Sequence, residues 1–169
     1  MITIKTNKLS GGGLCSALCV VMLFISSFIP NLKLAFLFAT SVIIGICLLR
    51  YRLFTALLCY IAASVVSIFI LPSKLSALAF FVLFGNYPIV KLYIERIKNI
   101  VIEYIIKFFA ANIYLFLIYI MLRALGEEAF FDFNSIILYL TGIFLLLFYD
   151  LVFGFIINAF YKSYYKYLK

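Results

Sequence analysis

Residues 135–160 read SIILYLTGIFLLLFYDLVFGFIINAF, an apolar run whose single charged side chain is Asp150. A stretch of about 20 apolar residues is long enough to cross the roughly 30 Å hydrocarbon core of a bilayer as a helix. A helix that is apolar on every side has no face for water, so it belongs in lipid or deep inside a large protein. This stretch therefore predicts a membrane-spanning helix.

The same pattern recurs along the chain, and it predicts six spans. They are residues 13–30, 33–49, 53–71, 75–90, 100–122 and 135–160. Of the 169 residues 68% are hydrophobic and 12% are charged, with a mean hydropathy of +1.26, whereas a soluble domain is about half apolar and about a quarter charged. Backbone groups in lipid must be satisfied within the chain, and the alternation of a membrane barrel is absent. We expect an all-α polytopic membrane protein, a six-helix transmembrane bundle with residues 1–169 as one domain in a lipid bilayer.

The distribution of Lys and Arg predicts the orientation of this bundle. An even number of spans puts both ends on one side, which would carry Lys5, Lys8, Arg50, Arg52, Lys91, Arg96, Lys98, Lys107, Lys162, Lys166 and Lys169. The opposite side would carry only Lys33, Lys74 and Arg123, together with the acidic cluster Glu127, Glu128 and Asp132. Cytoplasmic loops hold the excess of basic residues. Both termini are therefore expected to be cytoplasmic.

Composition also limits the chemistry. The chain has no His, no glycine-rich phosphate loop and no carboxylates paired at catalytic spacing, so we expect no enzyme, no cofactor and no metal site. The four cysteines, Cys15, Cys19, Cys47 and Cys59, lie inside apolar runs and are expected to be packing residues. The net charge of +8 is explained by the topology signals and does not indicate a nucleic-acid partner.

The fourth span is short and is interrupted by Gly85-Asn86-Tyr87-Pro88. Proline removes a backbone donor and clashes with the preceding turn, so we expect a kink there. A kinked helix can expose polar groups to a cavity, as in many membrane carriers, which makes Asn86 and Tyr87 candidate substrate-binding residues. Plain bending to fit a short span is the alternative. Residues 89–98 then have amphipathic spacing and fit either an interfacial helix or a continuous helix that protrudes into the cytoplasm.

Asp150 is expected near mid-membrane, where a carboxylate costs about 2.5 to 3.5 kcal/mol on insertion scales. It should therefore face the bundle interior, either protonated or partnered. Asn112 is expected at nearly the same depth, so the two side chains could meet, and Lys107 could reach Asp150 or snorkel to the headgroups. Glu103 precedes Lys107 by four residues, the favourable order for a helical ion pair. The polar set is either a site for substrate or proton, or a set of interhelical bonds that fixes packing.

The overall plan resembles the substrate-binding S component of energy-coupling factor transporters. A short polar leader runs into Leu9-Ser10-Gly11-Gly12-Gly13-Leu14-Cys15-Ser16-Ala17-Leu18, and Phe28-Ile29-Pro30 follows. The resemblance implies a subunit that binds a small-molecule nutrient, with ATPases and a transmembrane coupling subunit as partners. In that family an Ala-x-x-x-Ala pattern of the first helix docks on the coupling subunit. Gly13-x-x-x-Ala17 occupies the matching region here, and Gly12 with Ser16 forms a second small pair, so these four residues are the predicted docking residues.

The chain also resembles uncharacterised small membrane proteins of low-GC Gram-positive bacteria, which implies a bacterial cell membrane. Two other functions remain open. A membrane scaffold or regulatory protein would pack its small-residue faces against a partner membrane protein and would need no ligand. A small secondary carrier or channel would need a continuous polar path across the membrane. The sequence identifies no particular substrate.

Overall fold

The computed structural model describes residues 2–95, 97, 99–124 and 135–166, and this part of the chain is helical with no strand. The elements are α1 (Ile2–Phe28), the 3-10 turn η1 (Pro30–Leu32), α2 (Lys33–Tyr51), α3 (Leu53–Ile70), α4 (Lys74–Ala79), the π-helical segment η2 (Phe80–Phe84), α5 (Tyr87–Ile94), α6 (Ile100–Ala124) and α7 (Ser135–Lys166). The predicted all-α class is confirmed. The acidic cluster Glu127, Glu128 and Asp132 lies outside the described residues.

Six segments are long and apolar enough to cross a membrane. They are Leu9–Phe28, Pro30–Tyr51, Leu53–Ile70, Lys74–Ile94, Val101–Arg123 and Tyr139–Lys162. Their bounds agree with the predicted spans to within four residues at each end. Length and composition thus make the chain a multi-pass membrane protein.

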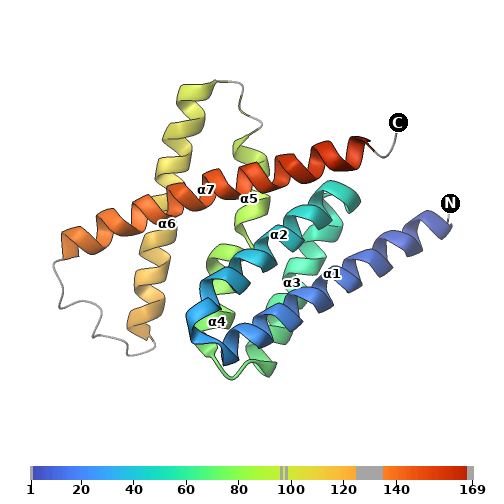
Figure 1. The fold of residues 1–169 in the computed structure, drawn as a ribbon, viewed down its shortest axis with the longest axis horizontal. Coiled ribbons are helices and arrows are strands. Elements are labelled where there is room, and N and C mark those ends of the chain that lie inside the picture. The colour runs from blue at the N-terminus through green and yellow to red at the C-terminus, as the bar shows by residue number, and fades with distance from the viewer. Residues whose placement is uncertain (1, 96, 98, 125–134, 167–169) are drawn as a thin grey trace.

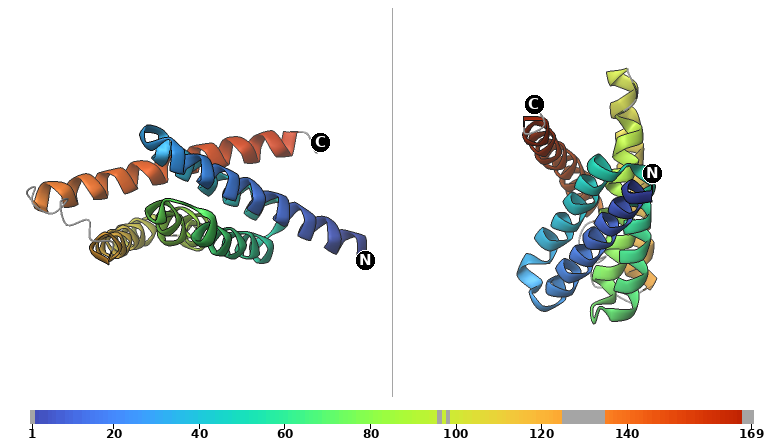
Figure 2. Two further views of the ribbon diagram at one scale, coloured as in Figure 1. Left: turned by 90° about the horizontal axis from the view of Figure 1, so that it is seen from below. Right: turned by 90° about the vertical axis from the view of Figure 1, so that its right-hand side faces the viewer.

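The first three helices form a compact group, because the connections between them are too short for any other arrangement than neighbouring antiparallel helices (Figure 1). The α4–η2–α5 segment packs on this group, and α6 follows on its outer side. Helix α7 crosses α5 and α6 in Figure 1 and packs on both α2 and α6. Figure 2 shows α6 and α7 in different layers of the molecule. Because α7 packs on both α2 and α6, it connects these two layers.

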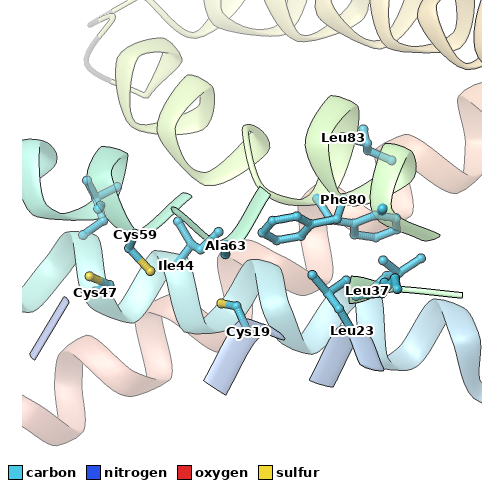
Figure 3. Close-up of a cluster of buried hydrophobic side chains, with 14 of the residues drawn as sticks. Cys19, Leu23, Leu37, Ile44, Cys47, Cys59, Ala63, Phe80 and Leu83 are labelled. Carbon is cyan, nitrogen blue, oxygen red and sulfur yellow. The ribbon is translucent and has the colours of Figure 1, made fainter. Parts of the chain in front are cut away.

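The best-packed part of the core lies where α1, α2, α3 and η2 meet (Figure 3). Leu23, Leu37, Ile44 and Phe80 are fully or almost fully buried there. Three cysteines, Cys19, Cys47 and Cys59, are free thiols buried in the same cluster, which confirms the prediction that they serve packing. In contrast, many large apolar side chains of α6 and α7 are exposed. Such a surface is stable in lipid and unfavourable in water.

The fourth span is interrupted as predicted, and the interruption is a π-helical turn. The Gly85 backbone N–H donates to the Phe80 carbonyl at 2.7 Å, and the Tyr60 hydroxyl donates to the Phe81 carbonyl at 2.8 Å. A Cβ atom on Gly85 would lie 2.6 Å from the Tyr60 ring and 2.9 Å from the Phe80 carbonyl oxygen, so glycine is required. Neighbouring side chains thus satisfy the backbone groups that the break frees, as a membrane segment requires.

Of the predicted amphipathic stretch 89–98, residues 89–94 form the second part of α5. Pro88 lies in the first turn of α5, where a missing N–H costs nothing, so the helix resumes instead of ending. It then ends at Ile94, and both Lys91 and Ile94 are buried. Residues up to Ile94 therefore continue the fourth candidate span, with Lys91 and Ile94 facing the protein interior and Tyr93 exposed.

Candidate functional site

Asp150 is the centre of an ion network that joins three helices. Lys91 of α5 forms an ion pair with Oδ1 of its carboxylate, and Lys107 Nζ of α6 lies 3.1 Å from Oδ2. Lys91 also donates to the Asp150 backbone carbonyl at 3.2 Å. Each lysine has a second carboxylate four residues away on its own helix, Glu95 at 3.1 Å from Lys91 and Glu103 at 2.8 Å from Lys107. The predicted pair of Glu103 and Lys107 is thereby confirmed.

The central ion pair of this network, Lys91 with Asp150, is buried. Lys91 is 6% exposed and Asp150 is 8% exposed, whereas the Glu95 side chain is half exposed. Removing a carboxylate and an ammonium from water costs several kcal/mol each, and it is tolerated only when the two groups satisfy each other. Asp150 therefore faces the interior and is partnered, the second of the two states expected for it.

Tyr87 connects this network to an aromatic cluster. Its hydroxyl donates to Asp150 Oδ1, and its ring meets Tyr149 edge-on at a centroid distance of 4.7 Å and Phe153 at 5.8 Å. The hydroxyls of Tyr149 and Ser41 are 2.5 Å apart, which links α7 to α2. Side chains of three different helices are thus held in fixed positions around one carboxylate.

The two predicted asparagines do not join this network. Asn112 accepts a hydrogen bond from the Tyr139 hydroxyl and donates to the Phe108 carbonyl, so the expected meeting with Asp150 is wrong. Similar depth in the membrane does not determine which way a helix face points, and the rotation of α6 directs Asn112 to a different part of α7. Asn86 ends the break before α5, where its carbonyl accepts from Ile89 and Val90.

Lys91 is the site residue that sequence reasoning missed. The sequence places it on the cytoplasmic side, because the fourth span is predicted to end at residue 90. Tyr87 and Lys91 are four residues apart, which places them on one face of a helix once that helix continues past Pro88. That spacing was the signal available in the sequence.

The space enclosed between Tyr87, Lys107 and Asp150 is too small for a ligand, whereas a separate cavity of about 230 Å³ lies beside Lys91 and Glu95, between α2, α5 and α7. A cavity lined by Tyr87, Lys91, Lys107 and Asp150 has a volume of about 20 Å³, room for about one water molecule. Every charge in it already has a partner. The arrangement can orient α5, α6 and α7, and it leaves little room for chemistry on a bound molecule.

A much larger cavity lies between α2, the α4–η2 segment, α6 and α7. Its volume is about 570 Å³ and its walls are formed by side chains such as Phe38, Leu83, Leu115 and Leu146. Lys33 is the only charged lining residue in the described part of the chain. Sites for small molecules typically measure about 300 to 1,000 Å³ and are mostly apolar with few polar groups. This cavity has both properties.

The cavity and the ion network share a wall. Tyr149 lines the cavity, contacts the Tyr87 ring and precedes Asp150 in the chain. An occupant of the cavity would touch Tyr149, whose position is set by Ser41 on one side and by Tyr87 on the other. A ligand in the cavity would therefore contact a residue, Tyr149, that packs directly on the Tyr87 ring of the ion network.

The predicted docking residues are divided between two faces of α1. A Cβ atom on Gly12 would lie 2.6 Å from Thr55 Cγ2, so Gly12 faces α3 within the chain. Gly13 has no atom within 4 Å of such a Cβ, and Ala17 is exposed beside it. Ser16 donates to the Gly13 carbonyl at 2.8 Å. Ser16 and Ala17 also form one side of a groove of about 350 Å³ between α1 and α3.

Among the described residues, no group of three His, Cys, Asp or Glu side chains is arranged to hold a metal ion. Comparison of the chain with protein-family models, with curated proteins and with solved structures finds no match. Function is therefore inferred from the chemistry of the cavity and of the surfaces, since a helical membrane fold by itself does not specify one.

Proposed function

We propose that the chain is a membrane subunit of the S-component type, which holds an apolar small-molecule nutrient between its helices and hands it to partner subunits that energise uptake. The single observation that carries this proposal is the cavity of about 570 Å³ between α2, η2, α6 and α7. A cavity of this size with apolar walls favours the transfer of an apolar group out of water or out of a less well packed lipid environment.

In this proposal Asp150 and Tyr87 are positioning residues and do not touch the ligand. What supports this assignment is that both oxygens of the Asp150 carboxylate already have partners, Lys91 and Tyr87 on Oδ1 and Lys107 on Oδ2. Their role is to hold α7 against α5 and α6 so that the cavity keeps its shape. Asn112 and Asn86 have no contact with the cavity lining and are not included in the ligand site.

The experiment that tests the proposal is saturable photolabelling of the purified protein by a diazirine-bearing hexadecanol, a neutral apolar probe. Labelled peptides should come from α2, α6 and α7. Ala35→Phe places a large ring in the cavity wall and should lower the labelling at least fivefold, while the matched change Ala159→Phe, on an exposed position of α7 outside the cavity lining, should leave it unchanged. Equal labelling of both variants and the native chain would contradict the proposal.

The proposed location is the bacterial cell membrane with both termini in the cytoplasm. Six spans put both termini on one side of the membrane. The amino end of α1 and the carboxyl end of α7 lie toward the same side of the molecule in Figure 1. With Lys91 and Lys107 assigned to the buried network, nine basic residues remain on that side against three on the other, still the imbalance expected of a cytoplasmic face. Green fluorescent protein fused to either end should fluoresce, and alkaline phosphatase fused to either end should be inactive.

A membrane scaffold or regulatory protein is the second candidate, and the small-residue groove between α1 and α3 favours it. Grooves of small residues let another helix approach closely. Affinity purification in mild detergent with mass spectrometry separates the two functions: recovery of ATPases and a coupling membrane protein supports uptake, and recovery of an envelope-assembly complex supports the scaffold. Gly13→Leu should remove the partner in either case, whereas Ala159→Leu should not. A small secondary carrier is less well supported, because the space enclosed between Tyr87, Lys107 and Asp150 holds about one water molecule.

A further inference from the structure

We propose that the ligand of the large cavity is an amphiphile with a long apolar chain and an anionic headgroup, and that Lys33 binds this headgroup. The inference rests on the proposed function and specifies the class of its ligand. It follows from the position of one cation on an otherwise apolar wall.

Lys33 is the first residue of α2 and, among the residues that the structure describes, the only charged one that lines the cavity. Its side chain is partly buried. Among the described residues it forms no ion pair with a carboxylate, in contrast to Lys91 and Lys107. The cavity therefore offers an apolar volume for a chain and, at one end, a cation whose charge the described residues do not neutralise.

The hydrogen bonds around Lys33 leave donors free for an acceptor from outside the chain. Lys33 Nζ donates to Ser73 Oγ at 3.1 Å, and Ser73 Oγ also accepts from Ser76 Oγ at 3.1 Å and from the Ser76 backbone N–H at 3.4 Å. An ammonium group has three donors and a hydroxyl has one. Two N–H groups of Lys33 can thus be directed at one bound anion.

The stability of α2 does not explain a lysine at this position. The amino end of a helix carries a partial positive charge, so an anion is favoured there and a cation is not. Leu32, the residue before α2, provides no side-chain cap, and the Lys33 N–H donates to the Pro30 carbonyl of the preceding 3-10 turn. A carboxylate or phosphate beside Lys33 would both neutralise the lysine and complement this end of the 19-residue helix.

Neighbouring Lys74 offers a matched control. It follows Ser73 directly and is exposed, and its Nζ donates to the Ile68 carbonyl at 2.8 Å. It is not part of the cavity lining. Lys74→Gln therefore removes the same charge from the same end of the molecule without altering the cavity.

The test compares two diazirine probes of equal chain length, hexadecanoate and hexadecanol, on the full-length purified protein at pH 8, where a carboxylic acid is ionised. The native chain should bind hexadecanoate about tenfold more tightly than hexadecanol. Lys33→Gln should remove this preference by weakening hexadecanoate alone, Lys33→Arg should keep it, and Lys74→Gln should leave both affinities unchanged. Because the preference of the native chain is itself a measurement, the test does not depend on how well the Lys33 variants fold.

The outcomes separate the two proposals. Equal binding of both probes would overturn the anionic headgroup while leaving the apolar ligand site in place. Absence of saturable labelling by either probe would overturn the proposed function as well. Competition by phosphatidylglycerol in nanodiscs identifies the source of the headgroup: displacement of hexadecanoate assigns the site to a bilayer phospholipid, and lack of displacement assigns it to a free single-chain amphiphile, each with the anionic headgroup retained.

Discussion

Lys107 Nζ of α6 lies 3.1 Å from Asp150 Oδ2 of α7 and completes a chain of ion pairs that begins at Glu95 on α5. Helix α7 exposes many large apolar side chains, and its most extensive contacts are with α2 and α6. The Asp150 network therefore has a large share in fixing where α7 lies. It is the polar counterpart of the apolar core that joins α1, α2 and α3.

Asp150→Asn should destabilise the protein by about 3 kcal/mol. Loss of one member of a buried ion pair costs about 3 to 5 kcal/mol, and the lower end applies because Lys91 and Lys107 each keep a carboxylate on their own helix. The unfolding free energy in a titration with sodium dodecyl sulfate measures the effect. A double-mutant cycle with Lys91→Met should give a coupling of at least about 1 kcal/mol; strict additivity would show that the two side chains do not interact.

Tyr149→Phe should cost about 1 kcal/mol, since it removes the hydroxyl that lies 2.5 Å from Ser41 Oγ. Ser41 is fully buried and would retain a polar group without that partner, and interhelical hydrogen bonds in membranes are worth about 0.6 kcal/mol on average and up to about 1.7. Thermal unfolding in detergent provides the measurement. The double change Ser41→Ala with Tyr149→Phe should recover part of the loss because no unpaired hydroxyl then remains. A double variant weaker than Tyr149→Phe alone would refute this link between α2 and α7.

Arg52→Gly should raise the thermal stability. Arg52 joins α2 to α3 with φ 75° and ψ 172°, a conformation that costs a residue other than glycine about 1 to 3 kcal/mol. Glycine relieves this strain and loses some of the gain through greater freedom of the unfolded chain, so the net effect is about 1 kcal/mol. Arg52→Lys keeps the charge and the strain and should match the native chain. A melting temperature of Arg52→Gly below that of Arg52→Lys would contradict the strain.

Gly12→Ala and Gly13→Ala should change stability in opposite directions. Alanine at position 12 would press on Thr55, at a cost of about 1 to 3 kcal/mol that exceeds its gain in helix propensity. Alanine at position 13 meets no atom within 4 Å and should stabilise α1 by up to about 1 kcal/mol. Unfolding of the two variants side by side in the same detergent tests this. Equal effects would mean that the two glycines do not lie on different faces of the helix.

Much of the architecture could be predicted because it depends on properties that are local in the chain. A run such as residues 53–70 is too apolar for water and has the length of a membrane helix whatever surrounds it. The break near Gly85 was predictable for the same reason, since proline and glycine act on the backbone next to them. The pair of Glu103 and Lys107 followed from helix geometry alone.

The candidate site was less predictable. The position of Asp150 in its span indicated that it needed a partner, and Tyr87 was among the residues singled out. Lys91 is missed because the predicted span ends at residue 90, and only packing of the following turn against α2 and α7 extends it. Asn112 was assigned the wrong neighbour because depth along a helix leaves the rotation about its axis open.

The amino-acid sequence by itself determined that the chain belongs in a bilayer, that it has six spans with bounds known to within four residues, and that one carboxylate inside them required compensation. Those features follow from the free energy of placing each segment in lipid or in water, which is a sum over neighbouring residues. Only the tertiary structure decided that α7 crosses to join two layers, that Lys91 and Lys107 meet Asp150, and that an apolar cavity remains beside Lys33. These depend on how helix faces fit together over distances that no local pattern records.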